Sequence, residues 1–187
     1  MEPSTFLNPN QAILAAGITE GMRVADFGDS AGFFARAAAR AVGPGGVVWA
    51  VDHNADLLTR IKSVALAEKL HNVEILRGDI ARAGGSALPE ASFDFVVIAN
   101  VLFTLEQKQG LIAEAGRVLK PHGRVLIIDW QGSFGGLGPH PEHLITVGAA
   151  RDLFEKGGFT YVADIPAGEY HWGFVARKKS GIAHNTK

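Results

Sequence analysis

Asp26-Phe27-Gly28-Asp29-Ser30-Ala31-Gly32 is the stretch that decides the fold, because it joins an apolar segment directly to a helical one. The residues from Met22 to Phe27 are apolar enough for a buried strand, and Gly32 to Val42 carry the spacing of a helix. Gly28 and Gly32 allow a tight turn and the close approach of a ligand, while the helix N-terminus offers N–H groups to a carboxylate. A glycine-rich turn is also a common structural device, so the assignment of a ligand depends on other residues.

The same alternation of short β-branched runs and longer Ala- and Leu-rich runs continues along the chain, which is typical of βαβ units and a parallel sheet. Pro and Gly in two short segments, Gly43-Pro44-Gly45-Gly46 and Lys120-Pro121-His122-Gly123, are expected to stop helices and return the chain to the sheet. We expect parallel strands at Met22–Phe27, Val47–Val51, Val73–Leu76, Phe93–Ala99 and Arg124–Ile128, and helices at Gly32–Val42, Asn54–Leu70 and Glu106–Leu119.

The end of the chain departs from this pattern. After an expected helix near Thr146–Lys156, Phe159–Asp164 and Tyr170–Arg177 have the character of strands, and only residues 165–169 join them. A parallel crossover needs about a dozen residues, so this last pair is predicted to be antiparallel. We expect one domain over residues 1–179 and a flexible tail over 180–187.

Composition restricts the functional class. The 187 residues contain 18 Lys and Arg against 19 Asp and Glu, for a net charge of −1, which argues against a nucleic-acid partner. The chain has no cysteine, which excludes disulfides, thiolate metal sites and cysteine nucleophiles. Neither a signal-peptide pattern nor a membrane-spanning run of roughly 20 apolar residues is recognisable. We therefore expect a cytoplasmic protein, monomeric or homodimeric, without a membrane span.

Asp52 is the next residue with a chemical interpretation. It ends the second expected strand, 24 positions after Gly28. An acidic residue about 20 positions past the glycines, at the tip of strand two, is where the ribose hydroxyls of a nucleoside are bound. Asp52 is equally well placed to cap the helix that is expected from Asn54, and the two roles are compatible.

Polar residues also follow the third and fourth strands. Gly78-Asp79-Ile80 place a carboxylate and an apolar side chain where an adenine amino group and ring face are recognised, and Asn100 follows the fourth strand. Ligands of open α/β sheets bind beyond the carboxyl ends of the strands, at the point where the strand order reverses. The four strand ends therefore predict one common crevice.

These residues, and the chain from about Pro9 to Lys178, resemble the class I S-adenosylmethionine-dependent methyltransferases. The resemblance implies a doubly wound, Rossmann-like α/β fold whose seven-stranded sheet has the order 3-2-1-4-5-7-6, with the last strand antiparallel. It implies S-adenosylmethionine as cofactor, S-adenosylhomocysteine as product, and a small-molecule acceptor methylated by in-line displacement. The expected cofactor-binding residues are Asp26, Gly28, Asp29, Ser30, Gly32, Asp52, His53, Gly78, Asp79, Ile80 and Asn100.

The resemblance also suggests what these residues contact. Asp26 and the Gly28 loop would face the methionine end, Asp52 the ribose, Asp79 and Ile80 the adenine, and Asn100 the region near the acceptor. Two further stretches, Arg117–Arg124 and Ile128-Asp129-Trp130, are similar to small bacterial members related to the quinone-biosynthesis C-methyltransferases. Such members commonly have Gly where Ser30 stands.

The sequence leaves the catalytic residue unassigned. A base is needed only if the acceptor loses a proton as it reacts, and the candidate bases are His140, His143, Asp129 and His171. The Gly- and Pro-rich segment Gln131–His143 follows the fifth strand and is expected to cover or shape the acceptor pocket. Candidates for that pocket are Asp129, Trp130, His140, His143, Tyr170 and His171.

Other interpretations compete with this one. Gly28-Asp29-Ser30-Ala31-Gly32 fits the G-x-S-x-G elbow of a serine hydrolase with Ser30 as nucleophile, but no earlier strand can provide the second oxyanion donor. The glycine spacing does not fit a nicotinamide dehydrogenase. A non-catalytic module that binds S-adenosylmethionine stays open. His140-Pro141-Glu142-His143 resembles half of a metal site, yet Pro141 makes it a loop, and no metal is expected.

Overall fold

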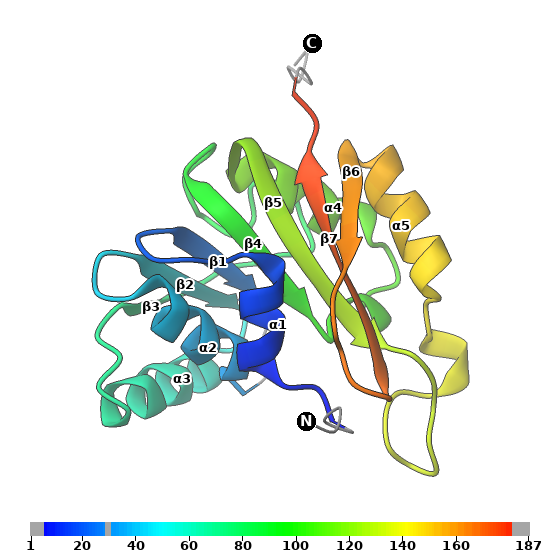
Figure 1. Ribbon diagram of the computed structural model, residues 1–187, viewed down its shortest axis with the longest axis horizontal. Coiled ribbons are helices and arrows are strands. Elements are labelled where there is room, and N and C mark those ends of the chain that lie inside the picture. The colour runs from blue at the N-terminus through cyan, green and yellow to red at the C-terminus, as the bar shows by residue number, and fades with distance from the viewer. Residues whose placement is uncertain (1–5, 29–30, 181–187) are drawn as a thin grey trace.

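The structure is a computed structural model that describes residues 6–28 and 31–180. Asp29, Ser30 and most of the expected tail lie outside the described residues. One seven-stranded sheet crosses the molecule (Figure 1). Its strands are β1 (Arg23–Phe27), β2 (Val47–Asp52), β3 (Val73–Arg77), β4 (Phe93–Ala99), β5 (Leu119–Trp130), β6 (Phe159–Asp164) and β7 (His171–Lys178).

The strand order is β3-β2-β1-β4-β5-β7-β6, and β7 pairs antiparallel with both β5 and β6. The predicted doubly wound sheet and its antiparallel last strand are therefore confirmed. The link of residues 165–170 between β6 and β7 is too short for a crossover helix, as the sequence indicated. The order reverses between β1 and β4, which is where open α/β sheets bind their ligands.

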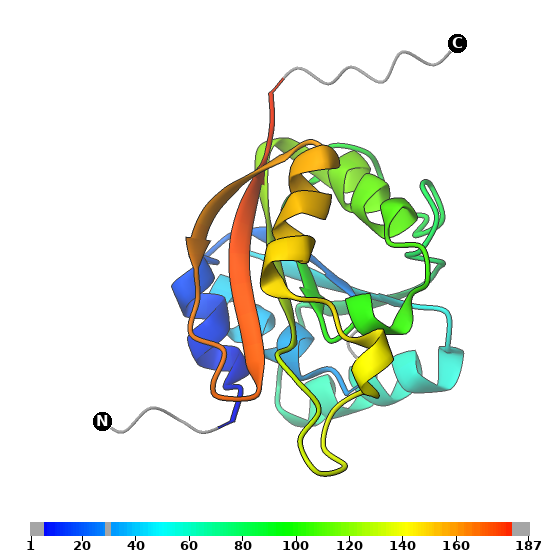
Figure 2. The same ribbon diagram turned by 90° about the vertical axis from the view of Figure 1, so that its right-hand side faces the viewer.

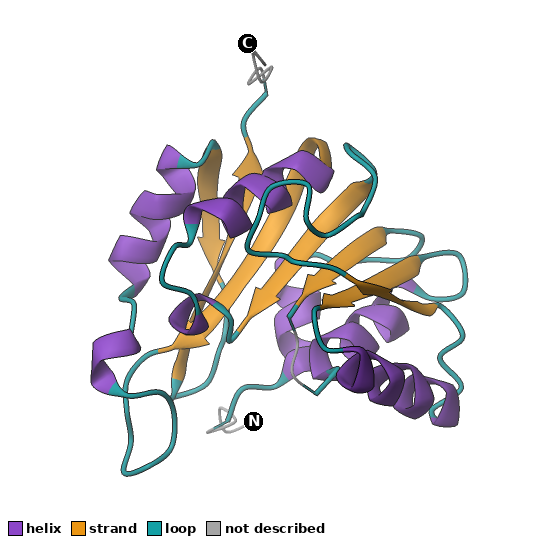
Figure 3. Cartoon of the chain, turned by 180° about the vertical axis from the view of Figure 1, so that it is seen from behind, coloured by secondary structure: helices purple, strands orange, loops and turns teal. Residues whose placement is uncertain are grey.

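Helices cover both faces of the sheet, so the fold has three layers (Figures 2 and 3). Buried residues of α1, α2 and α3 pack on one face, and those of α4 and α5 pack on the other. None of the helices in the described ranges combines the length and apolar character needed to cross a bilayer. The helices are α1 (Pro9–Ala16), α2 (Phe33–Val42), α3 (Ala55–Ala67), α4 (Gln109–Val118) and α5 (Val147–Lys156), with 3-10 turns η1 (Leu102–Thr104) and η2 (Pro141–His143).

Alternation along each strand decides which face a side chain reaches. On β5, Leu126 and Ile128 join the core under α1, α2 and α3, whereas Ile127 joins the core under α4 and α5. On β7, Val175 belongs to the first core and Trp172 and Phe174 to the second. The two interior cores therefore share the strands but use alternate residues.

The prediction was wrong around the fourth crossover. The expected helix Glu106–Leu119 is shorter, because η1 precedes it and α4 begins only at Gln109. The expected helix stop Lys120–Gly123 lies instead inside β5, which starts at Leu119. Phe93 pairs with Leu119 and Phe95 with Arg124, so the extra residues form a bulge, and His122 adopts a positive φ of 64° there. Pro and Gly are tolerated in a strand at such a bulge.

Candidate functional site

The loops after β1, β3 and β4 meet at one point. A Cβ atom on Gly28 would lie 3.0 Å from Cδ1 of Ile80 and 3.0 Å from Cγ2 of Val101. Gly28 has a φ of +76°, and its N–H donates to the Val51 carbonyl at 3.0 Å. Gly28 is therefore required both by its backbone conformation and by the crowding of the neighbouring loops. The predicted convergence of loops at the carboxyl edge is present.

The two aspartates at the ends of β1 and β2 differ in their surroundings. Asp26 is buried, with 1% of its surface exposed. The Asp52 side chain is 13% exposed, and its Oδ1 accepts from the Asn54 N–H at 2.8 Å. Asn54, not Asp52, caps α3 through the N–H groups of Asp56 and Leu57. Because Oδ2 of Asp52 accepts no hydrogen bond from the described residues, it is available to a ligand hydroxyl.

The other residues expected at the adenosine end are more exposed. The His53 side chain is 90% exposed, with Nδ1 3.4 Å from Oδ1 of Asp52. The Asp79 carboxylate accepts from the Ala81 N–H at 3.0 Å and lies 3.9 Å from Nε of Arg82. The Gly78 N–H donates to the Asp52 carbonyl at 3.0 Å, which holds the loop after β3 beside the end of β2. The structure thus brings His53 and Gly78 to Asp52, whereas the Asp79 carboxylate contacts Ala81 and Arg82 of its own loop.

Asn100 has two features that indicate a ligand. Its φ is +58°, a conformation that costs energy for a residue other than glycine. Its Oδ1 is buried and has no hydrogen-bond partner among the described residues. An orphaned buried acceptor is costly, because water is excluded and no donor replaces it. A donor group supplied by a ligand would remove that cost.

Asn100 also lines a cavity of about 390 Å³ on the face of the sheet covered by α1 and α2. Two of the six expected acceptor-pocket residues, Trp130 and His171, line the same cavity. They are cross-strand partners on β5 and β7, and their ring centroids are 4.3 Å apart. The remaining lining residues are Phe6, Leu7, Pro9, Ala31, Phe33 and Phe34. The cavity is therefore largely aromatic, with Asn100 and the two paired rings as its polar groups.

His171 is buried in this cavity, with 7% of its surface exposed. Neither Nδ1 nor Nε2 has a hydrogen-bond partner among the described residues. Burial lowers the pKa of His171 to about 4, because the imidazolium form would lose its hydration. The ring is therefore neutral at neutral pH.

Asp129, which precedes Trp130, faces the opposite side of the sheet and does not line this cavity. Its Oδ2 accepts from the Leu102 N–H at 2.8 Å and its Oδ1 from the Trp130 N–H at 2.7 Å. Burial raises the pKa of Asp129 to about 6, and these backbone hydrogen bonds and Lys108 oppose the shift. The carboxylate holds η1 against the end of β5, so the structure gives it a positioning role.

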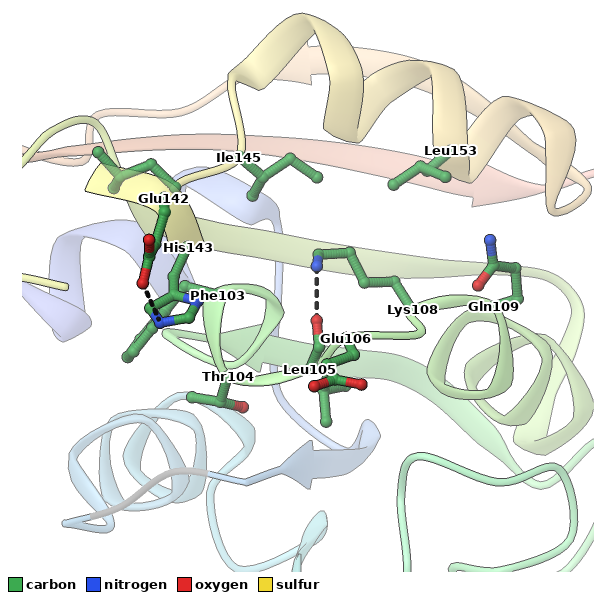
Figure 4. A pocket seen from close by; sticks show the side chains of 11 residues that line it. Phe103, Thr104, Leu105, Glu106, Lys108, Gln109, Glu142, His143, Ile145 and Leu153 are labelled. Atoms are coloured by element: carbon green, nitrogen blue, oxygen red, sulfur yellow. Dashed lines mark hydrogen bonds and ion pairs between the residues drawn. The ribbon is translucent and has the colours of Figure 1, made fainter. Parts of the chain in front are cut away.

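A larger cavity of about 890 Å³ lies between η1, α4 and α5 (Figure 4). His143 lines it and lies 3.6 Å from Oε1 of Glu142, while His140 is exposed and contacts the same carboxylate at 3.6 Å. Lys108 in this cavity donates to the Leu105 carbonyl at 2.6 Å. None of the expected cofactor-binding residues lines this cavity.

The segment Gln131–His143 lies beside both cavities. Phe134 packs edge-on against Tyr170 at 4.9 Å, and Tyr170 contacts the ring of Phe6 at 5.1 Å between centroids. Tyr170 therefore stands at the rim of the smaller cavity, beside Phe6, rather than inside it.

Within the described ranges, no three His, Asp or Glu side chains come close enough together to hold a metal ion. The two His–Glu contacts at Glu142 do not extend to Asp129 or His171.

The sequence did not identify the cavity residues from the N-terminal segment and from the start of α2. Phe6, Leu7, Phe33 and Phe34 are ordinary apolar residues in the sequence, and only the packing of α1 beside α2 brings them to Asn100. Phe33 is 57% exposed and Phe6 59% exposed, although both are large aromatic residues. Exposed aromatic residues at the mouth of a cavity commonly indicate a binding surface.

A family model described as a methyltransferase domain matches residues 18–158, which is more than half of the chain. The curated relatives include proteins named ubiquinone/menaquinone biosynthesis C-methyltransferase UbiE. The one from Laribacter hongkongensis is 35% identical over 115 residues, covering 62% of this chain and 46% of the relative. The one from Cupriavidus necator is 32% identical over 118 residues, covering 63% and 47%. The chain spans about half the length of the curated relatives it matches.

Solved structures give the same fold. A SAM dependent methyltransferase from Aquifex aeolicus has a TM-score of 0.83 and 27% identity, over 92% of this chain and 90% of that chain. The [4+2]-cyclase SpnF has a TM-score of 0.76 and 16% identity, over 92% and 80%, and shows the fold alone. The chain therefore belongs to the methyltransferase-domain family, and its predicted resemblance to S-adenosylmethionine-dependent methyltransferases is confirmed.

Proposed function

We propose that this protein transfers the methyl group of S-adenosylmethionine to a small-molecule acceptor bound in the cavity between Asn100, Trp130 and His171. One observation carries the proposal. Asn100, at the end of β4, belongs to the expected cofactor crevice and also lines the aromatic cavity. Cofactor and acceptor would therefore meet at this residue.

The residues of the crevice fit S-adenosylmethionine. Gly28 lets the loop after β1 turn with a positive φ and pack against Ile80 and Val101, which any larger residue would prevent. Oδ2 of Asp52 is placed to accept from the ribose hydroxyls, and Oδ1 of Asn100 can accept from the ammonium group. We assign Asp26, Gly32, His53, Gly78, Asp79 and Ile80 to the same site by their position at the strand ends, and Asp29 and Ser30 by sequence alone.

When bound, S-adenosylmethionine supplies a methyl group on a positively charged sulfur, which is already a good leaving group. The protein's part is alignment and exclusion of water. The rings of Phe33, Phe34 and Trp130 enclose the acceptor, while Asn100 fixes the neighbouring end of the cofactor. Holding both reactants in line for displacement is the largest contribution that such a site makes to the rate.

The cavity favours a small, flat, uncharged acceptor. About 390 Å³ accommodates a molecule of one or two rings, and none of the described residues that line the cavity carries a charged side chain. Aromatic walls favour ring stacking. The relatives named UbiE are C-methyltransferases of ubiquinone and menaquinone biosynthesis, and a ring acceptor is consistent with that similarity. We propose that the protein is a soluble intracellular enzyme that methylates such a ring acceptor, as a monomer or homodimer.

Calorimetric titration with S-adenosylmethionine and S-adenosylhomocysteine tests the cofactor site. We expect Asp52→Asn to weaken binding at least about tenfold, which corresponds to about 1.4 kcal/mol. Asp56→Asn, four residues later in the first turn of α3, removes the same charge away from the proposed ribose position and is the matched control. Equal affinities in all three proteins would contradict the assignment of Asp52.

Turnover separates an enzyme from the non-catalytic alternative. S-adenosylhomocysteine formation is measured over a panel of phenols, enols, thiols and amines. Binding of S-adenosylmethionine without product formation on any acceptor would favour the passive binder. Covalent labelling of Ser30 by a fluorophosphonate would instead favour the hydrolase.

A further inference from the structure

We propose that His171 is a catalytic residue of this site, which accepts the proton of an acceptor that carries a hydroxyl group at or next to the methylated position. The proposal rests on the proposed function and adds to it the identity of the base and the chemical class of the acceptor.

The position of His171 supports this role. It is the first residue of β7, and it lies in the cavity with Asn100 and against Trp130. More than nine-tenths of its surface is buried, yet both ring nitrogens lack a hydrogen-bond partner among the described residues. A neutral imidazole has one N–H donor and one lone pair, so two hydrogen bonds are missing. A hydroxyl group is the smallest ligand group that can donate to one imidazole nitrogen or accept from the other.

The other candidate bases are excluded by their positions. Asp129 faces the opposite side of the sheet, and its two oxygens are occupied by backbone N–H groups. His140 and His143 contact Glu142 in an exposed loop, and neither lines this cavity. Of the six residues predicted for the acceptor pocket, only His171 combines a titratable group with a place in the cavity.

Few charged groups among the described residues lie around His171. Of the elements that line the cavity, α1 has no ionisable side chain, and Arg36 of α2 is bound to the Ala31 carbonyl and to Glu68. On β5, Asp129 points to the other face, and Arg124 lies at the far end near Gly17. Asp26 shares the face of His171 but lies on β1, with β4 and β5 between. Beside His171, Tyr170 contacts Phe6 and Phe134 at the rim.

This apolar setting fits the charge balance of the reaction. Before transfer, the bound sulfonium places a positive charge next to the reacting methyl group, and a neutral His171 avoids adding another one beside it. During transfer, the O–H bond breaks, its proton moves to the imidazole, and its electron pair becomes available to the acceptor. The acceptor atom forms a bond to the methyl carbon, and the carbon–sulfur bond breaks with its electron pair going to sulfur. The positive charge therefore moves from sulfur to imidazolium, and the count of charges in the site is unchanged.

The test uses phenol and anisole as probes, because they share a ring and differ in the hydroxyl proton. With S-adenosylhomocysteine bound, we expect wild-type protein to bind phenol about tenfold more tightly than anisole, as one buried hydrogen bond allows. In His171→Phe this preference disappears, while affinity for S-adenosylmethionine is unchanged. In His171→Gln the preference for phenol is retained, because the amide still forms a hydrogen bond.

Turnover then separates positioning from proton transfer. On the best hydroxylated acceptor of the panel, His171→Gln lowers kcat by roughly a hundredfold or more with a much smaller change in KM. His71→Gln, at an exposed position in the turn before β3, keeps the wild-type kcat. A wild-type protein that does not distinguish phenol from anisole, or a His171→Gln protein with normal kcat, would overturn the proposal. Absence of S-adenosylmethionine binding to the wild type would instead overturn the proposed function, so the two failures are distinguishable.

Discussion

The imidazole of His171 packs against the indole of Trp130, with ring centroids 4.3 Å apart and planes inclined by 36°. The two residues are partners in the antiparallel pairing of β5 with β7. The indole covers one face of the imidazole and helps to exclude water from it. This contact contributes to the burial that keeps the histidine neutral.

Removing the indole is expected to restore an ordinary titration of His171. In Trp130→Ala, water reaches the ring, and the pKa of His171 rises from about 4 toward 6.5. NMR titration of the imidazole C–H signals measures this pKa, and His171→Phe is used to assign the signal of His171. Trp130→Phe retains an aromatic face and should keep the low pKa. An unchanged pKa in Trp130→Ala would show that other residues cause the burial.

Gly28→Ala is expected to damage the cofactor crevice. The new Cβ would meet Ile80 and Val101 at 3.0 Å in addition to the strain of a φ of +76°. Gly21 has a similar φ of +81° with nothing within 4 Å, so Gly21→Ala measures the conformational cost alone. That cost is roughly 1–2 kcal/mol in both variants, and the crowding adds roughly 1–3 kcal/mol to Gly28→Ala. Urea unfolding measures stability, and calorimetry should show weaker S-adenosylmethionine binding only for Gly28→Ala.

Asn100→Gly separates backbone strain from ligand binding. Glycine accepts the φ of 58° without strain, and the variant loses the buried Oδ1 that has no partner among the described residues, so the free protein should be as stable as the wild type or slightly more so. Affinity for S-adenosylmethionine should nevertheless fall several-fold. His122→Gly, at a positive φ of 64° on the β5 bulge, is the control and should leave affinity unchanged. Equal affinity in Asn100→Gly would remove this residue from the cofactor site.

Asp129 and His171 should make opposite contributions to the pH dependence of stability. The folded-state pKa of Asp129 is raised to about 6, so its contribution to stability is lost as pH rises toward 6. The folded-state pKa of His171 is lowered to about 4, so its contribution is lost as pH falls below about 6.5. Between about pH 4.5 and 6 the two effects oppose each other, and the wild type should show a shallow dependence.

Single substitutions should reveal the contribution of each residue to the pH dependence of stability. In Asp129→Asn, the free energy of unfolding should increase with pH across this window because His171 remains. In His171→Phe, it should decrease with pH because Asp129 remains. Each slope approaches about 1.4 kcal/mol per pH unit, as expected for one proton. Urea unfolding at several pH values measures them, and slopes of the same sign in both variants would contradict the opposed shifts.

Glu114 is expected to be a major stabilising residue. It is fully buried, and Arg117 binds both of its oxygens, at 2.8 and 2.7 Å. The N–H groups of Gly84 and Ser86 and the Ser86 hydroxyl also donate to it, which ties the loop before β4 to α4. Hydrogen bonds and Arg117 outweigh burial and lower its pKa. Glu114→Ala should cost roughly 3 kcal/mol, because it leaves buried donors unpaired.

Glu106→Ala is the control for this prediction. Glu106 is exposed in the loop before α4, and its removal should change stability by less than about 0.5 kcal/mol. A similar small change for Glu114→Ala would show that the network contributes little to stability.

The strands were predictable because burial on both faces leaves continuous apolar runs, as in Phe93–Ala99, and such runs are independent of the rest of the fold. The start of β5 was not predictable in this way. Pro121 and Gly123 are strong helix-stop signals, and whether they form a turn or a strand bulge depends on pairing with β4 across the sheet. Pairing between distant residues is absent from local periodicity.

The residues of the candidate site also include some that the local sequence predicted and some that it could not distinguish. Gly28, Asp52 and Asn100 follow expected strands, and the meeting of their loops follows from the parallel arrangement of β1, β2 and β4. By contrast, Asp129, Trp130 and His171 were all equivalent candidates in the sequence. The register of β5 against β7 places Trp130 opposite His171 and Asp129 opposite Trp172, on the other face.

The sequence by itself determined the order of elements, the family resemblance and the strand ends whose loops meet at Gly28, because glycine turns and buried strands are local properties. Tertiary structure alone decided which polar groups share the cavity of about 390 Å³. A side chain reaches one face of a sheet or the other by its register, and only packing against α1, α2 and Trp130 leaves His171 buried, neutral and without a hydrogen-bond partner among the described residues.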